Sequence, residues 1–238
     1  MPPPSSAHTT PTATWRFDRL RQASPQVLEK LRDMIVSLVL APGTVLSRPE
    51  LAEQFGLSQT PIRDAMIKLG EEGLVDIYPQ HATLVSRINI DSAKQAHFLR
   101  QAIEAEIVRT LAAAPKNPTL ITSLRAQIDV QAALMGNESH REFMAADQAF
   151  HGLMYVAAGV PELFDLVRRR SGHVDRLRLL HLPSAGKQRA IIRDHRHITD
   201  TIANSDPEAA QQSLRDHLSG TLSKIDEIRL KHPDYIAP

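Results

Sequence analysis

The sequence predicts a mostly α-helical protein, in which a winged helix-turn-helix of three helices and a β-hairpin precedes an all-α antiparallel bundle. Three short helical patterns between Ser24 and Gly73 are followed at once by two β-rich runs around residues 78–82, and this order is typical of a winged helix. From Asp91 onward, apolar residues recur at helical spacing almost throughout. The composition agrees, since only 10 residues are glycine and 4% are aromatic.

The composition also excludes several classes of protein. The 238 residues contain no cysteine, so disulfides and thiolate chemistry are excluded and any metal site must use histidine and carboxylate ligands. No apolar run has the length of a membrane span, and the N-terminus lacks a signal-peptide core, so we expect a cytoplasmic protein. The net charge is +1, and residues 1–87 hold nine basic and nine acidic side chains. DNA binding would therefore depend on where charges lie.

The N-terminal third divides into a tail and a compact domain. Residues 1–14 are rich in proline, serine and threonine and are predicted to be a disordered tail. In the domain, residues 15–88, the first helix is expected to begin at Ser24 and to stop before Pro42. Ser47 and Glu50 form a capping box that begins a second, short helix. The third helix is expected over residues 59–71, before the hairpin.

The start of this third helix carries polar side chains that a core does not need. A helix-turn-helix places this part of its second helix against base edges in the major groove. Arg63 could donate to guanine in a bidentate fork, and Gln59 could pair with adenine. Ser58 and Thr60 suit phosphate oxygens. The alternative is that Ser58 only caps the helix and that Arg63 is a solvated charge.

The second domain, residues 89–232, is predicted to be an antiparallel helical bundle. Helices are expected at about 91–114, 118–135, 139–158, 161–181, 186–204 and 207–230. Four polar side chains fall on or beside the apolar stripes of three of these helices: Asp147, His151, His195 and His217. Each histidine alone could be an ordinary core residue, and Asp147 and His151 could be an ion pair. Together they suit a divalent metal, Zn²⁺ first, with Ni²⁺, Mn²⁺ or Fe²⁺ possible.

Two resemblances extend these interpretations. The stretch SRPELAEQFGLSQTPIRDAMIKLGEEGLVDIYPQHATLVSRI resembles the DNA-binding domain of the GntR family of bacterial transcription regulators. The resemblance implies that Arg63 contacts DNA, with Thr60 and Ser58 beside it. The sequence departs from the family pattern at Gln59, at Pro49 (where Arg48 is the adjacent basic residue), and at the wing tip, where His81 and Ala82 replace Arg-Gly. We include Arg48, Gln59 and His81 among the candidate DNA contacts.

The helical region is similar to the FCD ligand-binding domain of FadR-type GntR regulators, through Asp147/His151, the run Asp194–Ile198 and the run Ala210–Leu218. This similarity implies that Asp147, His151, His195 and His217 hold a divalent metal beside an effector pocket. It also implies that Arg100 grips a carboxylate of the effector, although Arg100 could instead form an i,i+4 salt bridge with Glu104. His173 and Arg176, with Arg178 after them, could line the pocket or be solvated.

Together these features predict a homodimeric, metabolite-responsive transcription regulator that binds a palindromic operator. A repressor released by a small organic acid is favoured over an activator. One rival is a metal-dependent enzyme that uses the Asp/His₃ site to activate water. Another is a purely structural metal in a dimerisation module.

Overall fold

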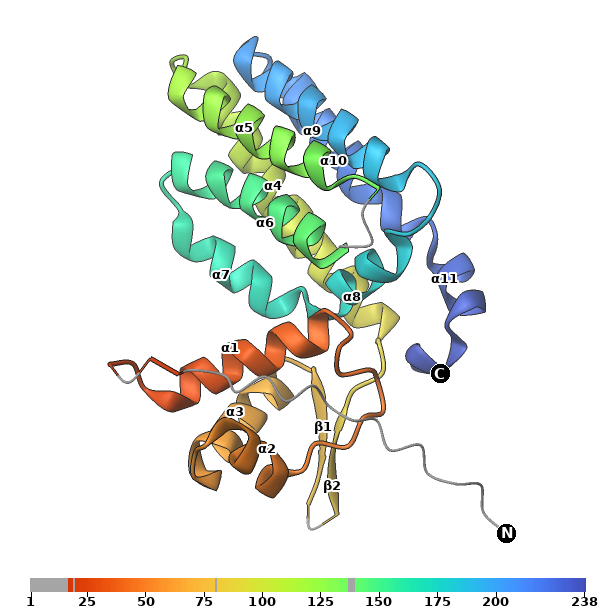
Figure 1. Ribbon diagram of the computed structural model, residues 1–238. Coiled ribbons are helices and arrows are strands. Elements are labelled where there is room, and N and C mark those ends of the chain that lie inside the picture. The colour runs from red at the N-terminus through yellow and green to blue at the C-terminus, as the bar shows by residue number, and fades with distance from the viewer. Residues whose placement is uncertain (1–16, 19, 80, 137–139) are drawn as a thin grey trace.

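The computed structural model describes residues 17–18, 20–79, 81–136 and 140–238. It has two parts, a small N-terminal domain with the only sheet of the described residues and a larger bundle of helices (Figure 1). The mostly α-helical fold with a winged helix-turn-helix is confirmed. The predicted tail, residues 1–14, lies outside the described residues.

The N-terminal domain is a three-helix core with a hairpin wing. Its elements are α1 (Ala23–Val36), α2 (Arg48–Phe55), α3 (Gln59–Glu71), β1 (Val75–Tyr78) and β2 (Ala82–Val85). The Ser47 side chain accepts the Glu50 N–H, as the capping box predicts, and Gly56 ends α2 in the left-handed region, at φ +64°. The antiparallel strands pair Val75 with Val85 and Tyr78 with Ala82.

The first helix differs from its predicted limits. It begins at Ala23 after an N-cap at Gln22, so Ser24 lies in the first turn instead of capping it. It ends at Val36, because Leu38 takes a left-handed φ of 59° and the chain turns back, with Leu40 N–H donating to Met34 O. The helix therefore ends before it reaches Pro42, the residue that was expected to mark its end.

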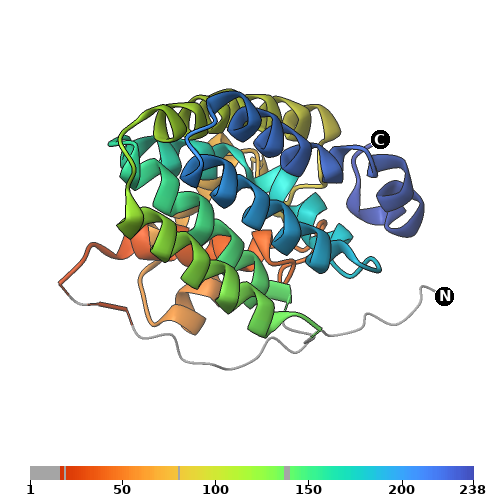
Figure 2. The ribbon, with the colours of Figure 1, turned by 90° about the horizontal axis from the view of Figure 1, so that it is seen from above.

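The bundle packs its helices around α4, which contacts α6, α7, α8, α9 and α10 (Figure 2). Its elements are α4 (Ile90–Ala113), α5 (Pro118–Leu134), α6 (His140–Ala157), α7 (Pro161–Arg170), α8 (Gly172–His181), α9 (Lys187–Ala203), α10 (Pro207–Leu222), α11 (Ile225–Lys231) and η1 (Pro233–Tyr235). Residues including Leu124, Phe143, Phe150 and Leu214 form its apolar core. No helix in the described ranges combines the length and hydropathy needed to cross a membrane.

Two helices predicted as continuous are divided. The one expected over 161–181 breaks at Ser171, whose hydroxyl donates to Val167 O. The chain approaches the N-terminal domain along α7, and α8 begins beside that domain and runs in a new direction (Figure 1). The one expected over 207–230 ends at Leu222. The following α11 places Ile228 in a separate apolar cluster with Ile88 and Ile236. Tertiary packing of these short segments outweighs the continuous helical periodicity of the sequence.

Candidate metal centre and nucleic-acid interface

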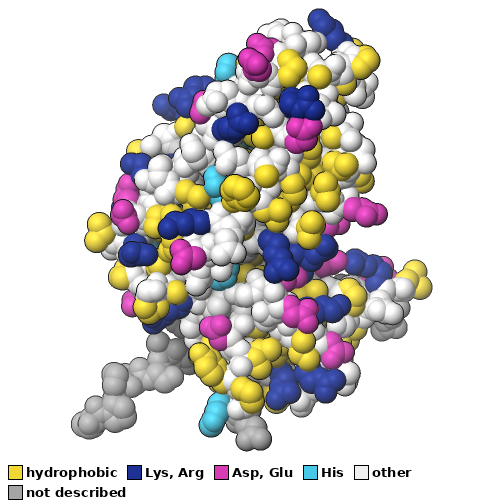
Figure 3. All heavy atoms as spheres, turned by 180° about the vertical axis from the view of Figure 1, so that it is seen from behind, with side chains coloured by type: hydrophobic (Ala, Val, Ile, Leu, Met, Phe, Trp, Pro, Cys, Tyr) yellow, Lys and Arg dark blue, Asp and Glu magenta, His cyan; other side chains and the backbone are white. Residues whose placement is uncertain are grey.

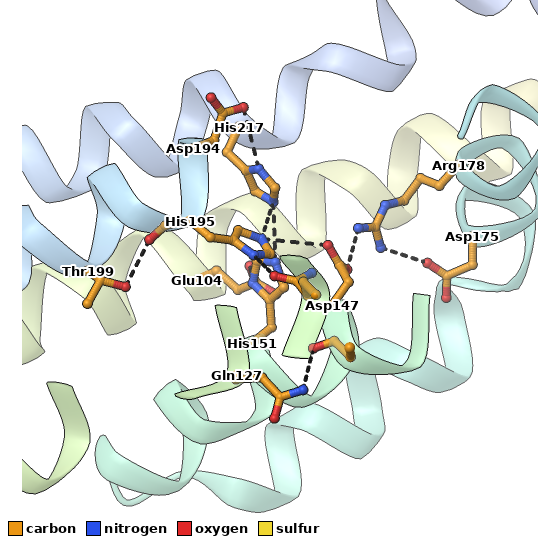
Figure 4. Close-up of polar contacts among 12 residues, drawn as sticks. Glu104, Gln127, Asp147, His151, Asp175, Arg178, Asp194, His195, Thr199 and His217 are labelled. Atoms are coloured by element: carbon orange, nitrogen blue, oxygen red, sulfur yellow. Dashed lines mark hydrogen bonds and ion pairs between the residues drawn. The ribbon is translucent and has the colours of Figure 1, made fainter. Parts of the chain in front are cut away.

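Four buried side chains converge in the centre of the bundle (Figure 4). Asp147 and His151 come from consecutive turns of α6, His195 from α9 and His217 from α10. Each offers one ligand atom, and these atoms all lie within 4.8 Å of one another. The i,i+4 spacing places Asp147 and His151 on one face of α6, and the packing of α9 and α10 against that face brings in the other two side chains.

The ring nitrogens show which atoms face the centre. The Nε2 atom of His217 lies 3.2 Å from that of His195 and 3.3 Å from that of His151. The Oδ1 atom of Asp147 lies 3.6 Å from His195 Nε2. Three imidazole nitrogens and one carboxylate oxygen therefore point into a common volume.

A second layer of acceptors faces the other nitrogen of each ring. Nδ1 of His151 lies 2.9 Å from Glu104 Oε2, and Nδ1 of His195 lies 2.7 Å from Gln131 Oε1. Nδ1 of His217 faces Asp194 Oδ2 at 3.8 Å. The Glu104 and Gln131 oxygens lie within hydrogen-bond distance of their rings, whereas the Asp194 contact is longer. A proton on each Nδ1 would leave the Nε2 lone pairs directed inward, as in metal sites whose histidines are oriented by outer partners.

The electrostatics of the cluster match the requirements of a cation. Burial lowers the pKa of His217 to about 4 and that of His195 well below its usual value, which keeps both rings neutral. Burial raises the pKa of Asp147, but the neighbouring positive charge, that of Arg178 first, outweighs burial and holds that pKa well below the usual range. Neutral imidazoles and an ionised carboxylate are the forms that bind metal.

Three buried atoms of the cluster make no hydrogen bond within the described residues, Asp147 Oδ1, His151 Nδ1 and His217 Nδ1, and Asp147 Oδ1 is the one that faces the centre. Within the described residues, Asp147 Oδ1 accepts no hydrogen bond, whereas Asp147 Oδ2 accepts one from Arg178 Nη2 at 2.5 Å. An unpaired buried carboxylate oxygen is costly. The four side chains therefore fit a divalent metal, which would take Oδ1 and the three Nε2 atoms.

A small cavity of about 20 Å³ beside the cluster is lined by both basic and apolar side chains. It reaches His217 from the outside and is bordered by His97 and Arg100 of α4, Arg178 of α8 and Lys187. Two of the three permanent cations already have carboxylate partners, since Arg100 Nε donates to Glu104 Oε1 at 2.8 Å and Arg178 pairs with Asp147. This lining suits an anionic ligand that reaches the metal centre from the cavity.

The predicted effector contacts occupy two different places. Arg100 lies at the cavity and also forms the i,i+4 pair with Glu104 that its spacing allowed. His173 and Arg176 lie where α8 meets the N-terminal domain, hydrogen-bonded to Asn89 and Ser86, and they do not border the cavity. The break at Ser171 redirects α8 and brings these two residues there. Arg178, two residues later, is the member of this group that reaches Asp147.

Two residues of the outer layer, Gln131 and Glu104, were not predicted as part of the site from the sequence pattern. Gln131 and Glu104 are fully or almost fully buried against the histidine rings. Glu104 was noted only as a partner for Arg100, and Gln131 was not identified. The signal that could identify both residues is a polar side chain at a buried helical position, and this burial is known only once the helices are packed.

The candidate DNA contacts lie on the N-terminal domain and are all exposed: Arg48, Ser58, Gln59, Thr60, Arg63 and His81. Ser58 is the N-cap residue of α3, but its side chain makes no cap hydrogen bond, unlike the capping alternative. The Arg63 side chain is 59% exposed and has only a 3.4 Å contact with Asp64. His81 lies in the turn between the two strands of the wing.

The surface has no face of one charge sign in the view of Figure 3, where basic and acidic side chains are interspersed. This agrees with the net charge of +1. On this face, recognition of DNA would therefore depend on individual exposed side chains such as those at the start of α3 and on the wing.

Comparison with known proteins assigns both domains. Residues 23–85 match the family model described as bacterial regulatory proteins, gntR family, and residues 95–220 match the FCD domain. A regulator from Streptomyces ambofaciens, named an HTH-type transcriptional regulator in an unstable DNA locus, is 34% identical over 87% of each chain. The chain belongs to the GntR family.

Further relatives agree with this membership. The HTH-type transcriptional repressor RspR of Escherichia coli is 27% identical to this GntR regulator over 95% of its chain and 99% of RspR. E. coli McbR/YncC shares the fold, with a TM-score of 0.74 at 18% identity over 89% of this chain and 99% of McbR/YncC. The protein is thus a DNA-binding transcription regulator with an FCD domain, and the enzyme alternative has no support from the family or these relatives.

Proposed function

We propose that this GntR regulator is a homodimeric repressor whose operator affinity is set by a small organic acid bound at a metal in the FCD domain. The observation that carries the proposal is the convergence of four buried ligand atoms beside a cavity lined by cations. A relative that covers 95% of this chain carries the name repressor. We infer that the protein acts in the cytoplasm, where bacterial DNA lies.

The DNA end of the proposal rests on α3. Gln59, Thr60 and Arg63 are exposed at its N-terminal end, and the Arg63 side chain is 59% exposed, with a 3.4 Å contact to Asp64. Arg63 would donate to guanine in the major groove, while Ser58 and Thr60 would position the helix on phosphates. Arg48 and His81 would add contacts from α2 and the wing. A symmetric dimer predicts a two-fold operator with half-sites on one face of the duplex.

For the metal we propose Zn²⁺, with Ni²⁺, Mn²⁺ and Fe²⁺ as outcomes of the same measurement. Asp147, His151, His195 and His217 would supply one oxygen and three nitrogens, a donor set that zinc accepts. When bound, the cation would attract carboxylate and hydroxyl oxygens. Elemental analysis of protein purified without chelator should give about one divalent ion per chain.

The effector is proposed to be a hydroxy- or dicarboxylic acid. One carboxylate would lie at the metal centre, and a second anionic group would be held by Arg100, by bidentate pairing. Arg178 and Lys187 border the same cavity and would add to its preference for anions. Because Arg100 already pairs with Glu104, the acid would share this guanidinium instead of meeting a free one.

The proposal is tested by titrating the operator complex with a panel of such acids, with and without chelator. The active acid should shift operator affinity by about 5- to 150-fold, the usual range of allosteric coupling. Arg100→Ala should weaken this response and leave acid-free operator binding nearly unchanged, with Arg109→Ala on the exposed face of α4 as the matched control. A response that survives chelation would remove the metal from the effector site. Operator affinity that ignores every acid would favour a structural metal.

A further inference from the structure

Arg176 of α8 is fully buried, yet its hydrogen bonds go to neutral groups. Its Nη1 atom donates to Ser86 O at 2.7 Å, and its Nη2 atom contacts Ser86 Oγ at 3.3 Å and His173 Nδ1 at 2.9 Å. Its Nε atom donates to Gly172 O at 3.2 Å. A buried guanidinium without a hydrogen-bonded carboxylate is costly unless its donors are satisfied. Four contacts to neutral acceptors satisfy it here, and two of them reach into the other domain.

The acceptors belong to the segment that joins the two domains. Ser86 follows β2 directly, and its hydroxyl donates to Gly73 O at 2.7 Å, which ties the wing to the end of α3. Three residues later, Asn89 N–H donates to His173 Nδ1 at 3.1 Å, and the Asn89 side chain caps α4 by accepting the Ser92 N–H. Arg176 and His173 therefore hold the connecting segment, residues 86–89, against α8 at both of its ends.

The first turn of α8 also touches the core of the winged helix. A Cβ atom on Gly172 would lie 2.5 Å from Cδ2 of Leu74, a residue buried in the N-terminal core. Only glycine permits this approach without a shift of the Leu74 side chain or of the α8 backbone. The contact is therefore closely packed, and α8 cannot shift without pushing on Leu74 or leaving it.

The same helix also reaches the metal centre, through Arg178, which follows Arg176 by two residues. Arg178 donates to Asp147 Oδ2 at 2.5 Å, and Asp147 Oδ1 faces His195 Nε2. The helical rise separates residues 176 and 178 by about 3 Å along the axis. The short helix α8 thus contacts the candidate ligand Asp147 through Arg178 and the interdomain segment through Arg176.

We propose that α8 couples the two domains, and that Arg176 is the positioning residue that latches the winged helix to it through Ser86. A cation at Oδ1 of Asp147 would draw charge from Oδ2 and oppose the Arg178 guanidinium, and the resulting shift of α8 would reach Ser86 through Arg176. The latch stands without the metal site proposed above, and only the zinc arm of the test rests on that site.

The test measures distances between the domains in the full chain. Because the chain has no cysteine, Glu53→Cys on α2 and Glu208→Cys on α10 can carry spin labels, with unlabelled protein added to suppress distances between subunits. Both positions are exposed. We expect Arg176→Gln, and independently Gly172→Ala, to broaden the distribution of distances in metal-free protein. Arg215→Gln, an exposed arginine on α10, is the charge-matched control and should leave it unchanged.

Adding zinc alone tests the coupling. In the parent protein zinc should shift the distance distribution, and in Arg176→Gln it should bind with the same stoichiometry but no longer shift it. An unchanged distribution in both Arg176→Gln and Gly172→Ala would overturn the latch. A zinc-induced shift of equal size in Arg176→Gln, or no shift in the zinc-bound parent, would overturn the coupling through α8. Failure of the parent to bind zinc would instead refute the proposed metal site, while the metal-free comparison would still decide the latch.

Discussion

Replacing Arg178 by glutamine should destabilise the metal-free protein strongly. Its side chain is 12% exposed, that of Asp147 is 0% exposed, and their atoms are 2.5 Å apart. Arg178→Gln would leave the carboxylate buried without its closest cation, and removing one partner of a buried ion pair costs about 3–5 kcal/mol. At about 2–4 °C per kcal/mol for a chain of this size, the melting temperature should fall by about 6–20 °C.

Zinc should reduce this loss, because the cation would neutralise Asp147 from its other oxygen. A ligand at 100 times its Kd stabilises a folded protein by about 2.7 kcal/mol, and the gain in the variant should exceed that in the parent. The loss should also shrink at acid pH. Because the folded-state pKa of Asp147 is depressed, its pairing contributes stability above the unfolded value of 3.8 and loses it as the pH falls below that value.

Thermal melts with and without zinc, at several pH values, measure these differences. The matched control is Arg125→Gln, which breaks a 3.4 Å pair with Asp200 whose side chains are 62% and 59% exposed. Such an exposed pair contributes about 0–1 kcal/mol. If Arg178→Gln melted within the range of Arg125→Gln in the absence of metal, the buried pair would not hold Asp147 and the electrostatic reasoning would be refuted.

Arg63→Ala should weaken specific operator binding by about 1–3 kcal/mol and relax base preference, measured by gel shift on base-substituted operators; an unchanged preference would limit Arg63 to phosphate contacts. His195→Ala and His217→Ala should each lose the bound divalent ion, and elemental analysis that finds full occupancy in both would reject these ligands. Metal-free protein should lose stability as the pH falls from 6.5 to about 4, because the pKa of His217 is lowered on folding and the unfolded chain binds the proton first; denaturant titrations across this range that show constant stability would contradict this reasoning.

The local pattern of the sequence was enough for most of the elements and for the candidate metal ligands. Ser47 and Glu50 define the start of α2, and the turn at Gly56 and the hairpin before residue 86 define the winged helix, because capping and turn preferences act within a few residues. Asp147 and His151 were identified from their i,i+4 spacing on an apolar face, and His195 and His217 from their places on apolar stripes. A polar residue within the apolar stripe of a helix can be recognised from the sequence alone, because burying it is costly without a partner.

Only the tertiary structure decided what lies against these residues. The division at Ser171 lets α8 begin beside the N-terminal domain and run in a new direction, which separates Arg176 from Arg178 in function although both read alike in the sequence. Gln131 and Glu104 became outer partners of the histidines only when α5 and α4 were packed beside α6 and α9. Contacts between residues 31 to 90 positions apart, such as Arg178 with Asp147 and Arg176 with Ser86, depend on helix packing that no local periodicity encodes. The sequence therefore determined which groups could bind metal or DNA, and the packing of α8 determined how the two sites are joined.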